Sequence, residues 1–170
     1  MTRPCRTALC LGLLLAAGCR IEDHTPAGSR RDEEAVQALV SRYARTLSER
    51  DWSGARELFW PDATYSGPLF PAGGSAHQAV PIDLAIDVIA RRVEGVDTGR
   101  FDVRVLRSDY RQDRDLAAVW LTTRRVQPVA GSVVDGEWIE HLVLRRINGE
   151  WRILTIAATI SHRGGARESR

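Results

Sequence analysis

The stretch RRINGEWRI, residues 145–153, decides the fold. Asn148 and Gly149 both tolerate a positive φ angle, and between alternating strands this pair is the strongest short-range hairpin signal. On either side, residues 137–147 and 150–161 alternate apolar with polar positions and are rich in β-branched and aromatic residues. The pattern predicts two antiparallel strands joined by a two-residue turn.

The same alternation occurs in two runs upstream, residues 101–110 and 116–126. The second half of the chain therefore predicts an antiparallel meander of four strands. One further brief strand is predicted earlier, at residues 63–66. Residues 67–80 contain two prolines and several glycines and are predicted to form a loop.

Helical spacing marks the region before the strands. From Asp32, six apolar residues three or four positions apart predict a helix, and three acidic residues in its first turn suit the helix dipole. A second helix is predicted at residues 52–60, ended by Pro61, and a third from Pro81 to Gly95. Helices followed by an antiparallel meander indicate an α+β fold in which the helices cover one face of a strongly bent sheet.

The first 18 residues have the order of a secretory signal. Arg3 and Arg6 precede an apolar run at residues 8–17, which is shorter than the roughly 20 residues that a membrane-spanning helix needs. LAAGC, residues 15–19, resembles the lipobox at which bacterial lipoproteins are acylated on Cys and cleaved before it. Plain secretion, with cleavage among the same small residues, is the alternative.

These features divide the chain into a lipoprotein signal peptide at residues 1–18, a lipidated Cys19 with a flexible tether to residue 31, a domain at 32–161 and a disordered tail at 162–170. We expect an exported lipoprotein, anchored to the membrane of the periplasm or outer cell envelope. Several acyl chains on one residue would hold it firmly at a membrane surface. Cys5 and Cys10 would leave with the signal, so the mature domain would have no thiol for a disulfide or a metal.

Charge argues against a nucleic-acid partner. The chain has 24 basic and 22 acidic residues, and removal of Arg3 and Arg6 with the leader leaves 22 of each. A near-neutral domain without a basic stripe lacks the positive surface that phosphate neutralisation requires. With 44% hydrophobic residues, the chain has enough apolar side chains for one packed core.

Several motifs resemble the SnoaL-like branch of the nuclear transport factor two superfamily: Tyr43, DW at 51–52, ELFWPDA at 57–63 and the hairpin at 145–153. The resemblance covers residues 32–161 and includes the order of the elements. It implies a cystatin-like α+β barrel, in which a cone-shaped, curved antiparallel or mixed sheet and three N-terminal helices enclose a blind pocket. The superfamily contains polyketide cyclases, ketosteroid isomerases, dehydratases and epoxide hydrolases beside members without known catalysis, so fold alone does not settle function.

The resemblance to ketosteroid isomerases places Tyr43 at the position of the Tyr that donates to the developing oxyanion. It places Gly67 where those enzymes have the Asp that moves the proton, and Val143 near the second acid of the oxyanion hole. A proton shuttle needs a titratable group within hydrogen-bond reach, so ketosteroid isomerisation is disfavoured. Arg100-Phe101-Asp102 has the local spacing of part of the Asp-Arg-Asp set of the epoxide-hydrolase branch.

Tyr43, His141 and Asp102 are therefore the candidate catalytic residues. By alternation His141 shares a strand face with Val143, and on the pocket face it could act as a general base or as a hydrogen-bond donor. A half-buried His satisfied by a neighbouring strand is the alternative. His77, ahead of the third helix, is a candidate for a pocket lid, although most exposed loop His residues have no role.

Aromatic and Arg side chains provide the candidate ligand contacts, because small-molecule sites combine apolar walls with a few polar groups. The candidates are Tyr43, Trp60, Tyr65, Arg104, Trp120, Arg124, Trp138 and His141. Core packing of the aromatic rings and an outer-face position for the two Arg residues are the alternatives. Asp83, Asp87 and Arg91, spaced four apart, favour a solvated helix face with an Asp-to-Arg pair over catalytic carboxylates.

Three functional hypotheses follow. The first is a lipid-anchored protein that binds a small, mainly apolar ligand in an aromatic-lined pocket without converting it. The second is a cofactor-independent lyase, isomerase or hydrolase for a polyketide-, steroid- or epoxide-like substrate, with Tyr43 beside His141 or Asp102. The third is a homodimeric interaction module that pairs through the outer sheet face. We expect no cofactor and no metal site.

Overall fold

The computed structural model describes residues 30–68, 78–97, 99, 101–129, 132–161 and 167–169. The predicted signal peptide, Cys19, His24, His77 and His162 lie outside this part of the chain. No helix within it is long and apolar enough to cross a membrane.

The long N-terminal helix is confirmed. Helix α1 spans Arg30–Ser48 and buries the stripe that the apolar spacing predicts, including Val36, Val40 and Tyr43. Asp32, in its first turn, accepts a hydrogen bond from the indole nitrogen of Trp151 at 3.2 Å and pairs with Arg146. Trp151 is buried, as expected for a core residue. These contacts hold the beginning of α1 against the hairpin that contains Arg146 and Trp151.

The second helix is shorter than predicted. Helix α2 spans only Trp52–Arg56, and strand β1, Phe59–Ser66, already includes Phe59 and Trp60. The Asp51 side chain caps α2 by accepting from the backbone N–H of Gly54 at 2.9 Å. Trp60 precedes Pro61, and a residue before proline is pushed into the extended region, so the strand begins here.

Helix α3, Ile82–Val93, agrees with the third predicted helix. Pro81 stands at its N-cap and also belongs to the two-residue strand β2, Val80–Pro81. The inward stripe of α3 includes Ile82, Ile86 and Val93. Asp83 and Asp87 do form a pair with an Arg, but the partner is Arg56 of α2 and not Arg91. The two short helices are thereby joined at the surface.

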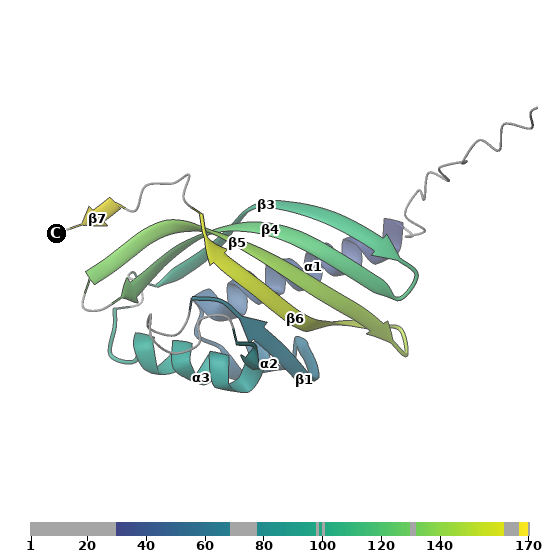
Figure 1. The fold of residues 1–170 in the computed structure, drawn as a ribbon, viewed down its shortest axis with the longest axis horizontal. Helices are drawn as coiled ribbons and strands as arrows, with labels where there is room; N and C mark the ends of the chain where they lie inside the picture. The colour runs from purple at the N-terminus through teal and green to yellow at the C-terminus, as the bar shows by residue number, and fades with distance from the viewer. Residues whose placement is uncertain are drawn as a thin grey trace, which may run out of the picture.

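Four long strands form the body of the sheet: β3 Asp102–Asp113, β4 Leu116–Val129, β5 Ser132–Ile147 and β6 Glu150–Ile160. The strand order is β2-β1-β6-β5-β4-β3, with β1 parallel to β6 and the other neighbours antiparallel. The sheet is mixed and bends strongly over α1 (Figure 1). The predicted α+β fold is therefore confirmed.

The turn at residues 148–149 is the predicted hairpin. Asn148 has a φ of 53° and Gly149 a φ of 84°, the two positive angles that a type I′ turn requires. Within the predicted tail, Arg167–Ser169 form a short strand, β7, that pairs with Val133–Asp135 of β5.

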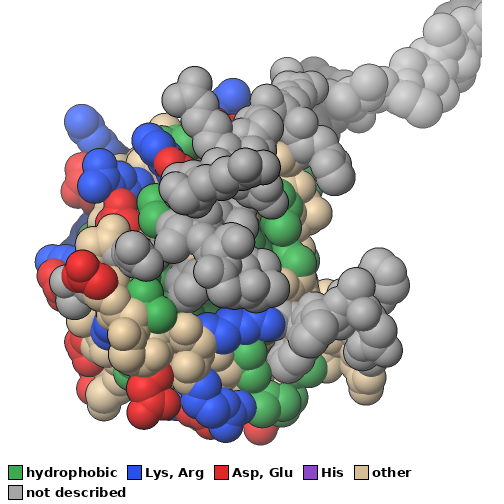
Figure 2. Space-filling view, turned by 90° about the vertical axis from the view of Figure 1, so that its left-hand side faces the viewer, with side chains coloured by type: hydrophobic (Ala, Val, Ile, Leu, Met, Phe, Trp, Pro, Cys, Tyr) green, Lys and Arg blue, Asp and Glu red, His purple; other side chains and the backbone are tan. Residues whose placement is uncertain are grey.

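Alternation along β4 and β5 separates an inner face from an outer face. Leu121, Thr123, Trp138, Leu142 and their same-face neighbours are buried against the helices, whereas the residues between them are more exposed. Arginine and acidic side chains are interspersed on the part of the surface shown in Figure 2. The interior is thus enclosed between the bent sheet, which includes β1, and the helices α1 and α3 (Figure 1).

Candidate functional site

A buried ion pair lies on the inner face of the sheet. The Arg125 side chain is 3% exposed and the Glu140 side chain 0%, and their closest nitrogen and oxygen atoms, Nη2 and Oε2, are 2.7 Å apart. Arg125 belongs to β4 and Glu140 to the neighbouring β5. Charges are almost never fully buried unless they are paired, and here each neutralises the other.

Three neighbours complete this ion pair. The Tyr43 hydroxyl donates to Glu140 Oε2 at 2.9 Å and accepts from Arg125 Nη2 at 3.2 Å. The Thr123 hydroxyl donates to Glu140 Oε1 at 2.7 Å. The Arg125 guanidinium lies over the ring of Trp138, 5.0 Å from its centroid. Helix α1 and strands β4 and β5 thus meet in one polar cluster.

Tyr65 of β1 lies near this cluster, and its hydroxyl group is unsatisfied within the part of the chain that the structure describes. Its side chain is buried, with 3% of the residue exposed, and its hydroxyl has no hydrogen-bond partner among the described residues. A Cβ atom at Gly67 would lie 2.6 Å from this hydroxyl and 3.0 Å from the Cβ of Ala158. The Tyr65 hydroxyl therefore occupies the space into which a side chain at position 67 would point, and the proton-moving Asp of ketosteroid isomerases has no room there.

Burial controls the protonation of the two tyrosines. Loss of hydration raises the pKa of Tyr43 well above its usual value, and the Glu140 carboxylate adds to this while Arg125 opposes it. Burial likewise raises the pKa of Tyr65 to about 12. Burial alone would lower the pKa of Arg125, but Glu140 and the tyrosines outweigh that effect and raise it. At neutral pH both tyrosine hydroxyls therefore keep their protons, and the Arg125 guanidinium is charged.

The structure brings three of the predicted site residues together. Tyr43, Tyr65 and Trp138 all lie buried in this interior region. Their predicted roles in ligand binding, and that of Tyr43 in catalysis, stay predictions. Together with Thr123, Arg125 and Glu140 they form the candidate site.

His141 and Trp120 lie on the opposite face of the sheet. Their rings are 5.0 Å apart as cross-strand neighbours, and Trp120 is 54% exposed. Val143 follows His141 on the same outer face by alternation. Successive strand residues point to opposite faces, and Glu140 takes the inner position. His141 therefore cannot share one pocket with Tyr43 in this structure, and the hypothesis that the two residues work together is wrong.

The other strand candidates also lie outside. Arg104 pairs with Asp102 at 2.5 Å, and Arg124 donates to Asp135 from Nε at 2.7 Å. The side chains of Arg104 and Arg124 are 73% and 55% exposed. This arrangement matches the outer-face alternative for the two Arg residues and separates Asp102 from Tyr43.

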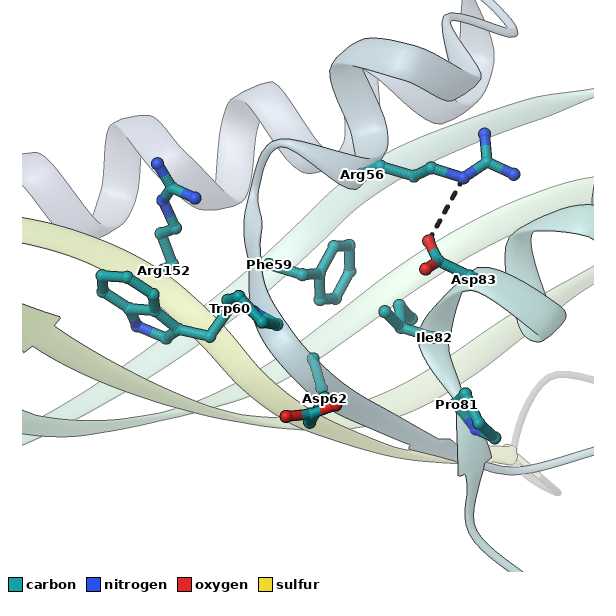
Figure 3. Close-up of a pocket in the computed structure, with 10 residues that line it drawn as sticks. Arg56, Phe59, Trp60, Asp62, Pro81, Ile82, Asp83 and Arg152 are labelled. Carbon is teal, nitrogen blue, oxygen red and sulfur yellow. Dashed lines mark ion pairs between the residues drawn. The ribbon is translucent and has the colours of Figure 1, made fainter.

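Trp60 lines a separate pocket at the surface. Its volume is about 390 Å³, and its walls come from α2, β1, the start of α3 and β6 (Figure 3). The five predicted aromatic residues therefore occupy three places: Trp60 here, Trp120 on the outer face and the remaining three inside. They do not form the single aromatic-lined pocket that we expected.

Sequence reasoning missed Arg125 and Glu140. Both lie in the same alternating phase as buried apolar residues, Arg125 after Leu121 and Thr123, and Glu140 between Trp138 and Leu142. The sequence signal that could have identified them is this alternation, because the inward-facing positions of a strand are buried. Among the described residues, no group of three His, Cys, Asp or Glu side chains could hold a metal ion.

Comparison with known proteins identifies the family. The family described as SnoaL-like domain matches residues 29–157. The chain belongs to the SnoaL-like family. No curated protein matches the chain.

Solved structures agree with this SnoaL-like fold. An NTF2-like protein with a cystatin-like fold from Novosphingobium aromaticivorans has a TM-score of 0.62 at 16% identity, covering 78% of this chain and 83% of that one. An NTF2-like protein of unknown function from Pseudomonas putida has a TM-score of 0.61 at 15% identity, covering 84% and 97%.

One structural neighbour has a stated activity. The hexachlorocyclohexane dehydrochlorinase LinA-type3 from Novosphingobium barchaimii has a TM-score of 0.62 at 11% identity, covering 80% of this chain and 90% of that one. The likeness at this identity concerns the fold alone.

Proposed function

We propose that the protein is a lipid-anchored component of the cell envelope whose SnoaL-like domain binds a small, mainly apolar molecule that carries one hydrogen-bond acceptor. The observation that carries this proposal is the buried Tyr65 hydroxyl, which has no partner among the described residues. A polar group left unsatisfied in the interior costs about 1–3 kcal/mol, so an acceptor that reaches it gains a favourable contact.

The surroundings of this hydroxyl suit such a ligand. Tyr43, which interacts electrostatically with Tyr65, supplies aromatic surface, and Ala158 adds a small apolar one. The charge of Arg125 is already balanced by Glu140 at 2.7 Å. A neutral acceptor such as a carbonyl therefore fits better than a carboxylate, which would bring an uncompensated charge into the interior.

Binding without conversion is favoured by the state of Glu140. Its two oxygens already accept from Tyr43, Thr123 and Arg125. A general base must reach the proton that it removes, and three donors from helix α1 and strand β4 already hold this carboxylate in one position. The cluster is thus better arranged to hold Tyr43 and Arg125 in place than to move a proton.

A cofactor-independent isomerase or lyase is the second candidate. It is favoured by the carboxylate 2.9 Å from the Tyr43 hydroxyl, a donor and a titratable group within hydrogen-bond reach. In this version Glu140 takes the role that the sequence suggested for His141 or Asp102. Turnover of a bound ligand by the parent protein would support this candidate, and binding without turnover would exclude it.

Pairing of two copies through the outer sheet face is a third candidate. Trp120 and Leu116, which share that face by alternation, are 54% and 48% exposed. Light scattering at high concentration tests it. A dimer that Trp120→Ser converts to a monomer supports pairing, and a monomeric parent protein excludes it.

The binding proposal is tested with a matched pair of probes, adamantanone and the hydrocarbon adamantane. Tryptophan fluorescence should report binding of adamantanone about fivefold tighter, since one net hydrogen bond contributes about 1 kcal/mol. Tyr65→Phe should remove this difference. Tyr110→Phe, at a hydroxyl that donates to Gln112, is the control and should leave it unchanged. Equal affinity for both probes, or an unaffected Tyr65→Phe variant, would overturn the proposal.

A further inference from the structure

The surface pocket at Trp60 lies apart from the interior cluster and has a different chemistry. We propose that it binds a small organic cation, an ammonium group attached to an apolar body. The inference does not depend on the proposed function, because the pocket shares no residue with the interior cluster.

A bulge in β1 builds one wall of this pocket. Phe59 pairs with Ile153 and Thr64 with Thr155, so β1 advances by five residues where β6 advances by two. The extra residues push Trp60 and Asp62 out of the ladder and toward the pocket (Figure 3). Asp62 has a φ of 64°, a left-handed conformation that Asp and Asn adopt more readily than most residues.

Two guanidinium groups, of Arg56 and Arg152, and two carboxylates, of Asp62 and Asp83, line the pocket. Arg56 is paired with Asp83 at 3.2 Å and also with Asp87, so two carboxylates surround one guanidinium. Arg152 donates two hydrogen bonds to Glu150, at 2.9 and 3.0 Å. The carboxylate of Asp62 has no counterpart among these groups. Each lining guanidinium is therefore balanced by a carboxylate of its own, and the Asp62 carboxylate is left to attract a cation to the pocket.

The remaining walls suit the apolar part of the ligand. Phe59, Ile82 and Pro81 contribute hydrocarbon surface, and the ring of Trp60 already holds one cation, the Arg152 guanidinium, 5.0 Å from its centroid. The Trp60 indole nitrogen donates to the carbonyl oxygen of Arg145 at 3.0 Å, which fixes the ring. A fixed indole beside a free carboxylate is a favourable combination for an organic ammonium ion.

The probe is phenethylammonium, with phenylacetate and phenethyl alcohol as anionic and neutral molecules of similar size. In nuclear magnetic resonance titrations, the Trp60 indole N–H signal, assigned by its loss in Trp60→Phe, should shift with phenethylammonium and not with the other two. Added salt should weaken the binding. Equal shifts with phenylacetate or phenethyl alcohol, or no shift with any probe, would overturn the proposal.

Asp62→Asn tests the residue itself and keeps a side chain that accepts the positive φ angle. Affinity for phenethylammonium should fall about fivefold, the effect of one exposed charge contact. Asp113→Asn, an exposed carboxylate at the end of β3, is the matched control and should bind as the parent protein does. Unchanged affinity in Asp62→Asn, or an equal loss in Asp113→Asn, would contradict the assignment.

Discussion

Tyr43 of α1 and Glu140 of β5 lie 97 positions apart in the sequence and share a hydrogen bond of 2.9 Å in the interior. The bond connects the helix that crosses the sheet to one of its central strands. The same carboxylate neutralises Arg125, so one side chain both positions the helix and balances a buried charge.

Glu140→Gln should therefore destabilise the protein strongly. The substitution keeps the shape but leaves Arg125 charged and without its counter-charge, which costs about 3–5 kcal/mol when a buried pair loses one partner. Urea unfolding at neutral pH measures the change in the free energy of unfolding. Asp109→Asn is the control, because the Arg107–Asp109 pair is largely exposed and such pairs contribute about 0–1 kcal/mol. Equal effects of the two substitutions would contradict this role of Glu140.

The two buried tyrosines should respond differently to removal of the hydroxyl. Tyr43→Phe removes a donor to Glu140 and an acceptor for Arg125, so we expect a loss of about 1–3 kcal/mol. Tyr65→Phe removes a hydroxyl without a described partner and should be neutral or stabilising. The comparison needs no ligand. A loss in Tyr65→Phe as large as that in Tyr43→Phe would show that its hydroxyl is satisfied in the folded protein.

Alkaline pH should weaken the fold through Tyr65. Its pKa of about 12 in the folded state exceeds the usual 10, so the folded protein holds this proton where an unfolded chain releases it. The contribution of Tyr65 to stability is complete below pH 10 and is lost as the pH rises from about 10 through 12. Unfolding curves across this window should show a steeper decline in the parent protein than in Tyr65→Phe. Identical slopes would contradict the raised pKa.

Much of the fold was predictable because its signals are local. Asn148 and Gly149 define a turn, and the spacing of Val36, Val40 and Tyr43 defines a helix face. The phase of each strand was harder to predict. Arg124 and Arg125 are adjacent, and only packing against Leu121 and Thr123 decides that the second Arg points inward. The general preference of Arg and Glu for the surface gives the wrong prediction for a buried pair whose two members come from different strands.

Cys19 lies outside the described residues, and its acylation is a prediction from the lipobox-like sequence. Cells grown with radiolabelled palmitate should label the parent protein, and Cys19→Ser should abolish the label and release the protein from the membrane fraction. Cys10→Ser is the matched control, because Cys10 would leave with the signal peptide. Labelling of the Cys19→Ser variant would exclude Cys19 as the anchor, and an unlabelled parent protein would favour plain secretion.

Gly67 tests whether the interior of this domain can be converted toward the ketosteroid isomerase arrangement. A Cβ atom there would meet the Tyr65 hydroxyl at 2.6 Å and its Cζ atom at 2.9 Å, so Gly67→Ala should cost about 1–3 kcal/mol by overpacking. Adding Tyr65→Phe removes the nearest of these atoms and should restore part of the loss. Urea unfolding of the two single variants and the double variant gives the coupling between the positions. Simple additivity would show that the Tyr65 hydroxyl is not what excludes a side chain from position 67.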